Sequence, residues 1–180
     1  MHVGIKIRSK ARRVNAAPLL PIGVLAVTIL SAHTIGMDIA TARITSTAAP
    51  AAFFERWADM ATWPEWNLDT EWVRLDGPFV EGATGTLKPK GGPKVSFTVA
   101  SLIPGREFVD VSHLVGARLT FAHHVAPAAD GGCTVEVAVS MSGPLARVWN
   151  LVLGKGLRGS VQPDLERLAR VAEATRAESA

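Results

Sequence analysis

The feature that most constrains the fold is a run of six strand-like segments between residues 70 and 142, divided by glycine and proline turns. Apolar and polar residues alternate along most of them, as in strands with one buried face. Turn signals such as Gly91-Gly92-Pro93 and Asp130-Gly131-Gly132 separate them. Strands joined by short turns pair with their neighbours, so the pattern predicts an antiparallel meander. The predicted strands cover residues 70–76, 82–90, 94–103, 107–115, 118–126 and 134–141.

One further strand and two helical patterns flank the meander. Asp38–Thr47 alternates as a strand, and Ala51–Met60 places Phe53 and Trp57 on one helical stripe. A longer helical pattern starts at Pro144, and interior glycines and a proline should kink or divide it. Its expected apolar stripe consists of Leu145, Val148, Leu151, Val152, Leu157, Val161, Leu165, Leu168 and Val171.

Composition indicates one globular domain and argues against nucleic-acid binding. The 180 residues are 48 % hydrophobic and 19 % charged, with a net charge of +3. Residues 1–36 contribute +5 to this charge, so the remaining chain carries −2. The expected folded domain, residues 37–174, therefore lacks a basic surface that could track phosphates. Residues 175–180 are predicted to be a polar tail.

The N-terminal extension, residues 1–36, has a basic start followed by the apolar run 22–32. This order is typical of a signal peptide, although the run is shorter than a comfortable membrane span. A membrane anchor, with contact through residues 14–36, is the second interpretation, and translation starting at Met37 is the third. The protein is expected in the cytoplasm if Met37 is the start, and membrane-anchored or exported otherwise.

The single cysteine excludes an internal disulfide framework. Cys133 follows a Gly-Gly turn and is interpreted as the first residue of a strand. No spacing of Asp, Glu, His and Cys predicts a metal site, and no glycine-rich phosphate loop or Ser-His-Asp set is present. We therefore expect no metal and no cofactor.

Four short motifs follow one another along residues 37–172. They are Trp63-Pro64-x-Trp66-Asn67, Leu75-Asp76-Gly77-Pro78-Phe79, Phe121-x-His123 and Ser142-Gly143-Pro144-Leu145. In this order they resemble the polyketide cyclase/dehydrase-like proteins of the SRPBCC family, in the START/Bet v 1 superfamily. The resemblance implies an α+β helix-grip fold, in which a seven-stranded curved antiparallel sheet wraps round a long C-terminal helix. It also implies a pocket for a hydrophobic ligand, while leaving the activity open.

Candidate ligand-binding residues come from the aromatic turn, the inward strand faces and the last helix. They are Trp63, Trp66, Phe97, Val109, Val111, His113, Phe121, His123, Val137 and Trp149. For Trp63 and Trp66, a role as a pocket lid and a role as core filling remain alternatives.

His123 is the one candidate catalytic residue. Its phase in the strand predicts the same inward side as Phe121, and a buried imidazole can polarise a carbonyl or transfer a proton. A structural histidine bonded to a backbone carbonyl is the alternative. His113 has the same expected inward phase, so the two imidazoles could meet across the ladder, whereas Asp110 is expected to face solvent.

Three functions are compatible with these features. The first is binding of a small hydrophobic or amphipathic molecule, such as a lipid, a polyketide or an aromatic metabolite. The second is a polyketide aromatase/cyclase or dehydratase in which His123 is the acid/base and His113 or Ser140 assists. The third is a cochaperone- or antitoxin-like interaction protein. The oligomeric state is not predicted.

Overall fold

The computed structural model describes residues 36–129 and 131–178, which belong to one compact unit, His33–Ala180. The interpretations of residues 1–35 as a signal peptide, an anchor or an upstream extension lie outside the described residues. Within the described ranges, no helix combines the length and the hydrophobicity that a membrane span needs.

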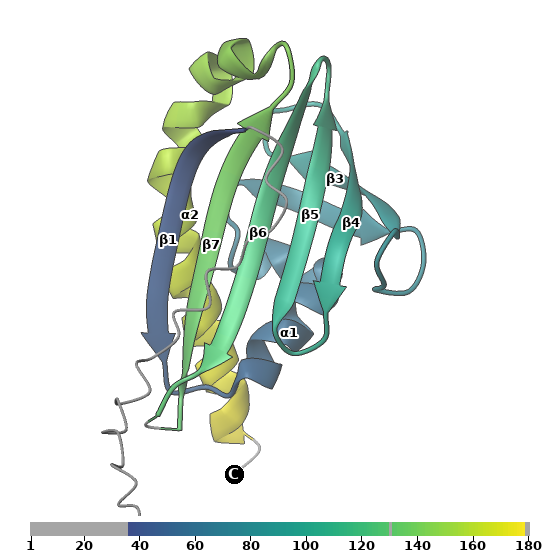
Figure 1. Ribbon diagram of the computed structural model, residues 1–180. Coiled ribbons are helices and arrows are strands. Elements are labelled where there is room, and N and C mark those ends of the chain that lie inside the picture. The colour runs from purple at the N-terminus through teal and green to yellow at the C-terminus, as the bar shows by residue number, and fades with distance from the viewer. Residues whose placement is uncertain (1–35, 130, 179–180) are drawn as a thin grey trace, which may run out of the picture. The chain divides into compact units, whose positions relative to one another are not determined.

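Seven antiparallel strands form one sheet in the order β1-β7-β6-β5-β4-β3-β2, with the helices on one side (Figure 1). This arrangement confirms the α+β helix-grip prediction. The elements are β1 (Met37–Ser46), α1 (Pro50–Ala58), the 3₁₀ helix η1 (Met60–Glu65), β2 (Thr70–Leu75), β3 (Thr84–Pro89), β4 (Val95–Ile103), β5 (Glu107–Leu114), β6 (Ala117–Pro127), β7 (Cys133–Ser142) and α2 (Ala146–Glu178).

The core lies on the face of the sheet that α1 and α2 cover, here called the inner face. β7 alternates strictly between buried and half-buried residues, as its sequence predicts. Its buried positions are Cys133, Val135, Val137, Val139 and Met141. On β6 the predicted phase is also confirmed, because Leu119, His123 and Val125 are buried.

The α1–η1 segment closes one part of the inner face. Pro50 occupies the first turn of α1, where its missing N–H costs no hydrogen bond. Trp63 and Trp66 are both about 5 % exposed, and their ring centroids are 5.4 Å apart. The Nε1 of Trp63 donates to the Trp57 carbonyl at 3.1 Å, and Nε of Arg167 donates to the Trp66 carbonyl at 3.0 Å. The aromatic turn is therefore part of the core and is joined to α2.

α2 differs from expectation in the face that its first half buries. It is one helix from Ala146 to Glu178, so Pro163 does not divide it, which was one of the two expected outcomes. Its first half turns the predicted apolar stripe outwards: Val148 is 55 %, Leu151 84 % and Val152 66 % exposed. The opposite side of these turns, which carries Ala146, Trp149, Leu153 and Leu157, is buried or half-buried.

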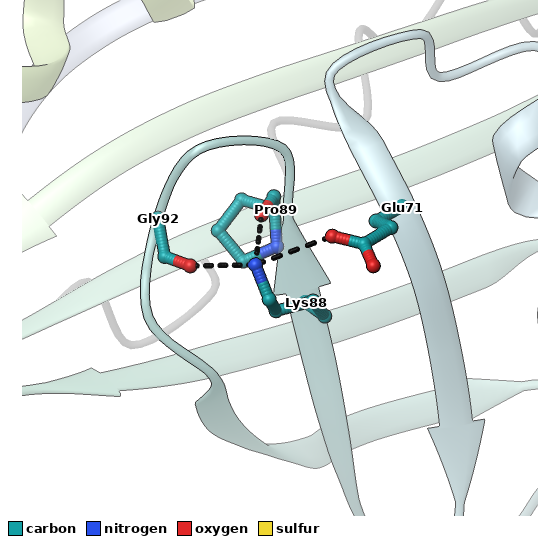
Figure 2. A network of polar contacts seen from close by, with 4 residues as sticks. All are labelled: Glu71, Lys88, Pro89 and Gly92. Atoms are coloured by element: carbon teal, nitrogen blue, oxygen red, sulfur yellow. Dashed lines mark hydrogen bonds and ion pairs between the residues drawn. The ribbon is translucent and has the colours of Figure 1, made fainter.

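One lysine connects strand β2 to the turn between β3 and β4. Nζ of Lys88 donates to the carbonyls of Pro89 at 3.1 Å and of Gly92 at 2.8 Å, within the turn between β3 and β4 (Figure 2). The same Nζ lies 3.2 Å from the carboxylate of Glu71 on β2. This network connects the edge strand β2 to the β3–β4 turn.

Candidate ligand-binding site

β5 turns a different set of side chains to the inner face from the set expected. Its buried residues are Phe108, Asp110 and Ser112. The reason is the turn to β6, where Leu114 pairs with Ala117 and only two residues join the strands. Directly paired residues of antiparallel strands share a face, and Ala117 and Leu119 are buried. A two-residue turn therefore places even-numbered residues of β5 beside odd-numbered residues of β6.

Contrary to the expected orientation, the outer face of β5 carries Val109, Val111 and His113. His113 is exposed and pairs with Arg118, and its Nε2 lies 2.9 Å from Oγ1 of Thr98. The two histidines therefore do not meet across the ladder. The expectation that Asp110 faces solvent is wrong for the same reason, since this residue is only 6 % exposed.

Asp110 and His123 form a buried polar pair on the inner face. Oδ1 of Asp110 lies 3.9 Å from Nδ1 of His123. That Nδ1 also lies 3.3 Å from the carbonyl oxygen of Phe108. Since a carbonyl can only accept, Nδ1 carries the proton in the neutral ring and Nε2 is left as an acceptor. Among the residues that the structure describes, Nε2 has no hydrogen-bond partner.

Burial keeps both members of this pair uncharged at neutral pH. Desolvation raises the pKa of Asp110 to about 8, against a smaller effect of a backbone hydrogen bond. Desolvation lowers the pKa of His123 to about 4, and the hydrogen bond with Phe108 opposes this shift. The 3.9 Å separation is close enough for an ion pair, but the direction of both shifts favours a carboxylic acid beside a neutral imidazole. The pair thus offers one O–H donor and one nitrogen acceptor.

Aromatic rings surround the His123 side chain. Phe108 stacks on the imidazole at 4.9 Å between centroids, Trp57 lies at 5.3 Å, and Phe121 at 6.3 Å. The indole N–H of Trp57 is buried and has no hydrogen-bond partner within residues 36–129 and 131–178. A buried donor without a partner costs about 1–3 kcal/mol. The site therefore combines an apolar wall with polar atoms that a ligand could satisfy.

The structure brings together most, but not all, of the predicted site residues. On the inner face or against the core are Trp63, Trp66, Phe97, Phe121, His123 and Val137. Trp149, at the start of α2, packs against the same core and donates its Nε1 to the carbonyl of Val115 at 2.8 Å. Asp110, Phe108 and Trp57 were not predicted as site residues. The spacing of the β5–β6 turn is the signal that could have found the first two.

Other polar features do not extend the site. In the described part of the chain, no group of three His, Cys, Asp or Glu residues could hold a metal ion. Cys133 starts β7 as expected, and burial raises the pKa of its thiol. A pocket of about 400 Å³ lies in the β2–β3 connection, between Asp76 and Thr84. Its lining contains neither member of the Asp110–His123 pair, and we assign no ligand to it.

Solved structures with the same fold include Ara h 8.0201 and two proteins from biosynthetic pathways or loci, all at low sequence identity. Ara h 8.0201 matches with a TM-score of 0.56 and 15 % identity, over 74 % of this chain and 96 % of its own. StfQ, a di-domain ARO/CYC from the steffimycin biosynthetic pathway, matches with a TM-score of 0.62 and 12 % identity over 79 % of this chain. DynU16, from the dynemicin biosynthetic locus, matches with a TM-score of 0.56 and 17 % identity over 74 % of this chain. This chain spans 52 % of StfQ and 46 % of DynU16.

At these identities the structural matches show the fold alone. No curated protein matches the sequence significantly. The sequence profile described as polyketide cyclase / dehydrase and lipid transport matches residues 37–173, which is most of the chain and nearly the whole domain expected at residues 37–174. The chain therefore belongs to the polyketide cyclase/dehydrase and lipid transport family.

Proposed function

We propose that residues 37–174 bind a small, mainly apolar molecule between the inner face of the sheet and α2. The observation that carries this proposal is the buried, uncharged Asp110–His123 pair. Buried polar groups are normally hydrogen-bonded within a protein. Here the Nε1 of Trp57 is buried without a partner among the described residues, and Nε2 of His123 accepts a hydrogen bond from none of them, which supports a ligand that supplies these contacts.

The proposed ligand has an aromatic or aliphatic body and one hydroxyl or carbonyl group. A ligand hydroxyl can donate to Nε2 of His123, and a ligand carbonyl can accept from the carboxylic acid of Asp110. The rings of Phe108, Phe121 and Trp57 suit a flat apolar body. Charged ligands are disfavoured, because neither side chain carries a compensating charge at neutral pH.

A second candidate function is a polyketide cyclase or dehydratase that acts on a carbonyl substrate. It is supported by the family and by the juxtaposition of an acid and a base on the inner face. Asp110 would donate a proton to the substrate oxygen, and Nε2 of His123 would accept one from carbon. Asp110 takes the assisting role that the sequence suggested for His113 or Ser140, because both of these residues lie on outer-face positions of their strands.

Native mass spectrometry of the full chain after mild purification tests the binding function. A co-purifying small molecule, lost when Phe121 is replaced in a folded Phe121→Asp variant, is the expected result. If the protein carries no molecule and takes up none from a panel of hydroxylated and carbonyl-containing aromatics, the proposal is wrong. The catalytic function is tested with His123→Gln, which should retain binding of a polyketide-like substrate and lose its turnover.

A further inference from the structure

The start of α2 exposes an apolar surface that the fold leaves uncovered. We call it the α2 patch, and it consists of Val115, Leu145, Val148, Leu151 and Val152, whose exposed fractions range from 41 % to 84 %. Isolated exposed apolar residues are ordinary, but a contiguous group marks an interaction site. These residues lie together. Val148, Leu151 and Val152 are three and four residues apart on α2, and Val115 is held beside the start of the helix.

Two hydrogen bonds fix the β5–β6 turn against the start of α2. The Leu145 N–H donates to the Gly116 carbonyl at 2.9 Å, and Nε1 of Trp149 donates to the Val115 carbonyl at 2.8 Å. Gly116 has a φ of +64° and no room for a side chain, because a Cβ there would meet the Leu145 side chain at 2.8 Å. The turn and the helix therefore present one continuous surface.

Basic residues accompany the α2 patch. Arg147, Lys155 and Arg158 are exposed on the same half of α2, and residues 137–163 contain no aspartate or glutamate. At 100° per residue, Lys155 lies on the same side as Val148 and Leu151, while Arg147 and Arg158 lie along one flank. An apolar stripe with Lys and Arg beside it is the composition of helices that lie in the interface of an anionic bilayer. A water-soluble protein partner with surface charges of both signs would not require residues 137–163 to lack aspartate and glutamate.

The chain enters the fold at the same end. Met37, the first residue of β1, pairs with Met141, which is five positions before α2 begins. The first residue of β1 therefore lies beside the end of β7 that leads into α2. The preceding sequence contains Lys6, Arg8, Lys10, Arg12 and Arg13 and then an apolar run.

We propose that the α2 patch docks the protein on the surface of a membrane that contains anionic phospholipid. Leu151 and Val152 enter the boundary between headgroups and acyl chains, and Arg147, Lys155 and Arg158 pair with lipid phosphates. This site is separate from the Asp110–His123 pair, and it does not depend on which ligand the inner face binds.

Co-sedimentation of the full-length chain with vesicles tests the docking. Vesicles of phosphatidylcholine and phosphatidylglycerol in equal parts should bind the protein at least about tenfold more tightly than pure phosphatidylcholine. A folded Leu151→Asp/Val152→Asp variant should lose at least about tenfold in affinity. Arg147→Glu/Lys155→Glu should lose about fivefold or more per position. Val80→Asp, at an apolar position 48 % exposed in the β2–β3 connection, is the matched control and should bind as the wild type does.

A fluorescent label tests the same proposal where binding by residues 1–35 could mask it. Cys133 is fully buried, so an environment-sensitive dye can be attached selectively at Leu151→Cys, with Val80→Cys as control. Anionic vesicles should shift the emission of the dye to the blue at the first position only. The proposal is overturned if vesicles do not bind, if they leave the emission of the dye at Leu151→Cys unchanged, or if the Leu151→Asp/Val152→Asp change instead converts a dimer to a monomer in sedimentation velocity.

Discussion

Oδ1 of Asp110 lies 3.9 Å from Nδ1 of His123, diagonally across the β5–β6 ladder, because Asp110 pairs with Phe121 and His123 with Phe108. Both side chains are buried, and the Phe108 ring stacks on the imidazole of His123. Their pKa values move in opposite directions from those of the unfolded chain. The pair therefore makes stability depend on pH in a way that one variant can isolate.

Between pH 6.5 and 8, the free energy of unfolding should fall by about 2 kcal/mol. Asp110, with a pKa raised from 3.8 to about 8, stabilises fully below pH 3.8 and loses this contribution as the pH rises through 8. His123, with a pKa lowered from 6.5 to about 4, stabilises fully above pH 6.5 and loses this as the pH falls through 4. Below pH 6.5 the two residues change the free energy of unfolding with pH in opposite directions. Above pH 6.5 only the contribution of Asp110 still changes with pH.

Urea unfolding across this range measures the effect. Asp110→Asn removes the titrating proton, so its stability should be nearly constant from pH 6.5 to 8. An Asp110→Asn protein with the same pH dependence as the wild type would show that Asp110 is not the group responsible.

Gly85→Ala should destabilise the protein by about 1–3 kcal/mol. A Cβ at Gly85 would lie 2.4 Å from the Phe97 ring and 2.6 Å from the Arg74 carbonyl oxygen, and the latter is backbone that cannot rotate away. A Cβ at Gly77 would have no heavy atom within 4 Å apart from its own chain neighbours, so Gly77→Ala serves as the control. Thermal unfolding of Gly85→Ala and Gly77→Ala should separate the two, and equal melting temperatures would contradict the packing described for β3 and β4.

Trp57→Phe should cost about 1 kcal/mol less than Trp63→Phe in the ligand-free protein. Both changes remove similar volume from the core. Trp63 loses the hydrogen bond from Nε1 to the Trp57 carbonyl, whereas Trp57 loses an N–H that has no partner in the described residues. Chemical denaturation of both variants after ligand removal gives the comparison, and the reverse order would be evidence that the Trp57 N–H is satisfied within the fold.

Glu173→Gln should lower the unfolding free energy by about 1–2 kcal/mol. Its carboxylate accepts from Oγ of Ser46 at 2.6 Å and from the backbone N–H of Thr47 at 3.1 Å, which ties α2 to the end of β1. The hydrogen bond with Ser46 is the main cause of a lowered Glu173 pKa, so this contribution is present above the ordinary pKa and is lost as the pH falls through the lowered one. Glu166→Gln, at an exposed position on the same helix, should change stability little. Matching losses in both variants would contradict this role for Glu173.

The sequence predicts the fold well because its turns are explicit. The Gly or Pro turns between β2 and β7 predict that each of these strands pairs with the next, and the strict alternation of β7 predicts its buried face. The two-residue Val115-Gly116 turn also determines the phase of β5 once the phase of β6 is known. The interpretation from valines alone failed because apolar residues occupy both faces of β5, and two of its polar residues, Asp110 and Ser112, are buried.

The α2 patch could not be predicted from periodicity. The first turns of α2 are apolar on two sides, so the stripe of Val148, Leu151 and Val152 is as regular as that of Trp149, Leu153 and Leu157. Only the packing of the helix against the sheet decides which stripe is covered. Likewise, the proximity of Trp57 to His123 depends on how α1 meets β6, and no spacing in the sequence contains that information.

The most direct test of the central claim compares the affinities of 2-naphthol and naphthalene, measured by calorimetry. Both have the same apolar body, and only 2-naphthol offers a hydroxyl for Nε2 of His123. The wild type should prefer 2-naphthol over naphthalene by about tenfold more than His123→Phe does, as expected for one buried hydrogen bond. His124→Phe, at the adjacent outer-face position, should keep the wild-type preference. If His123→Phe and the wild type show the same preference, the Asp110–His123 pair does not bind the polar group of the ligand.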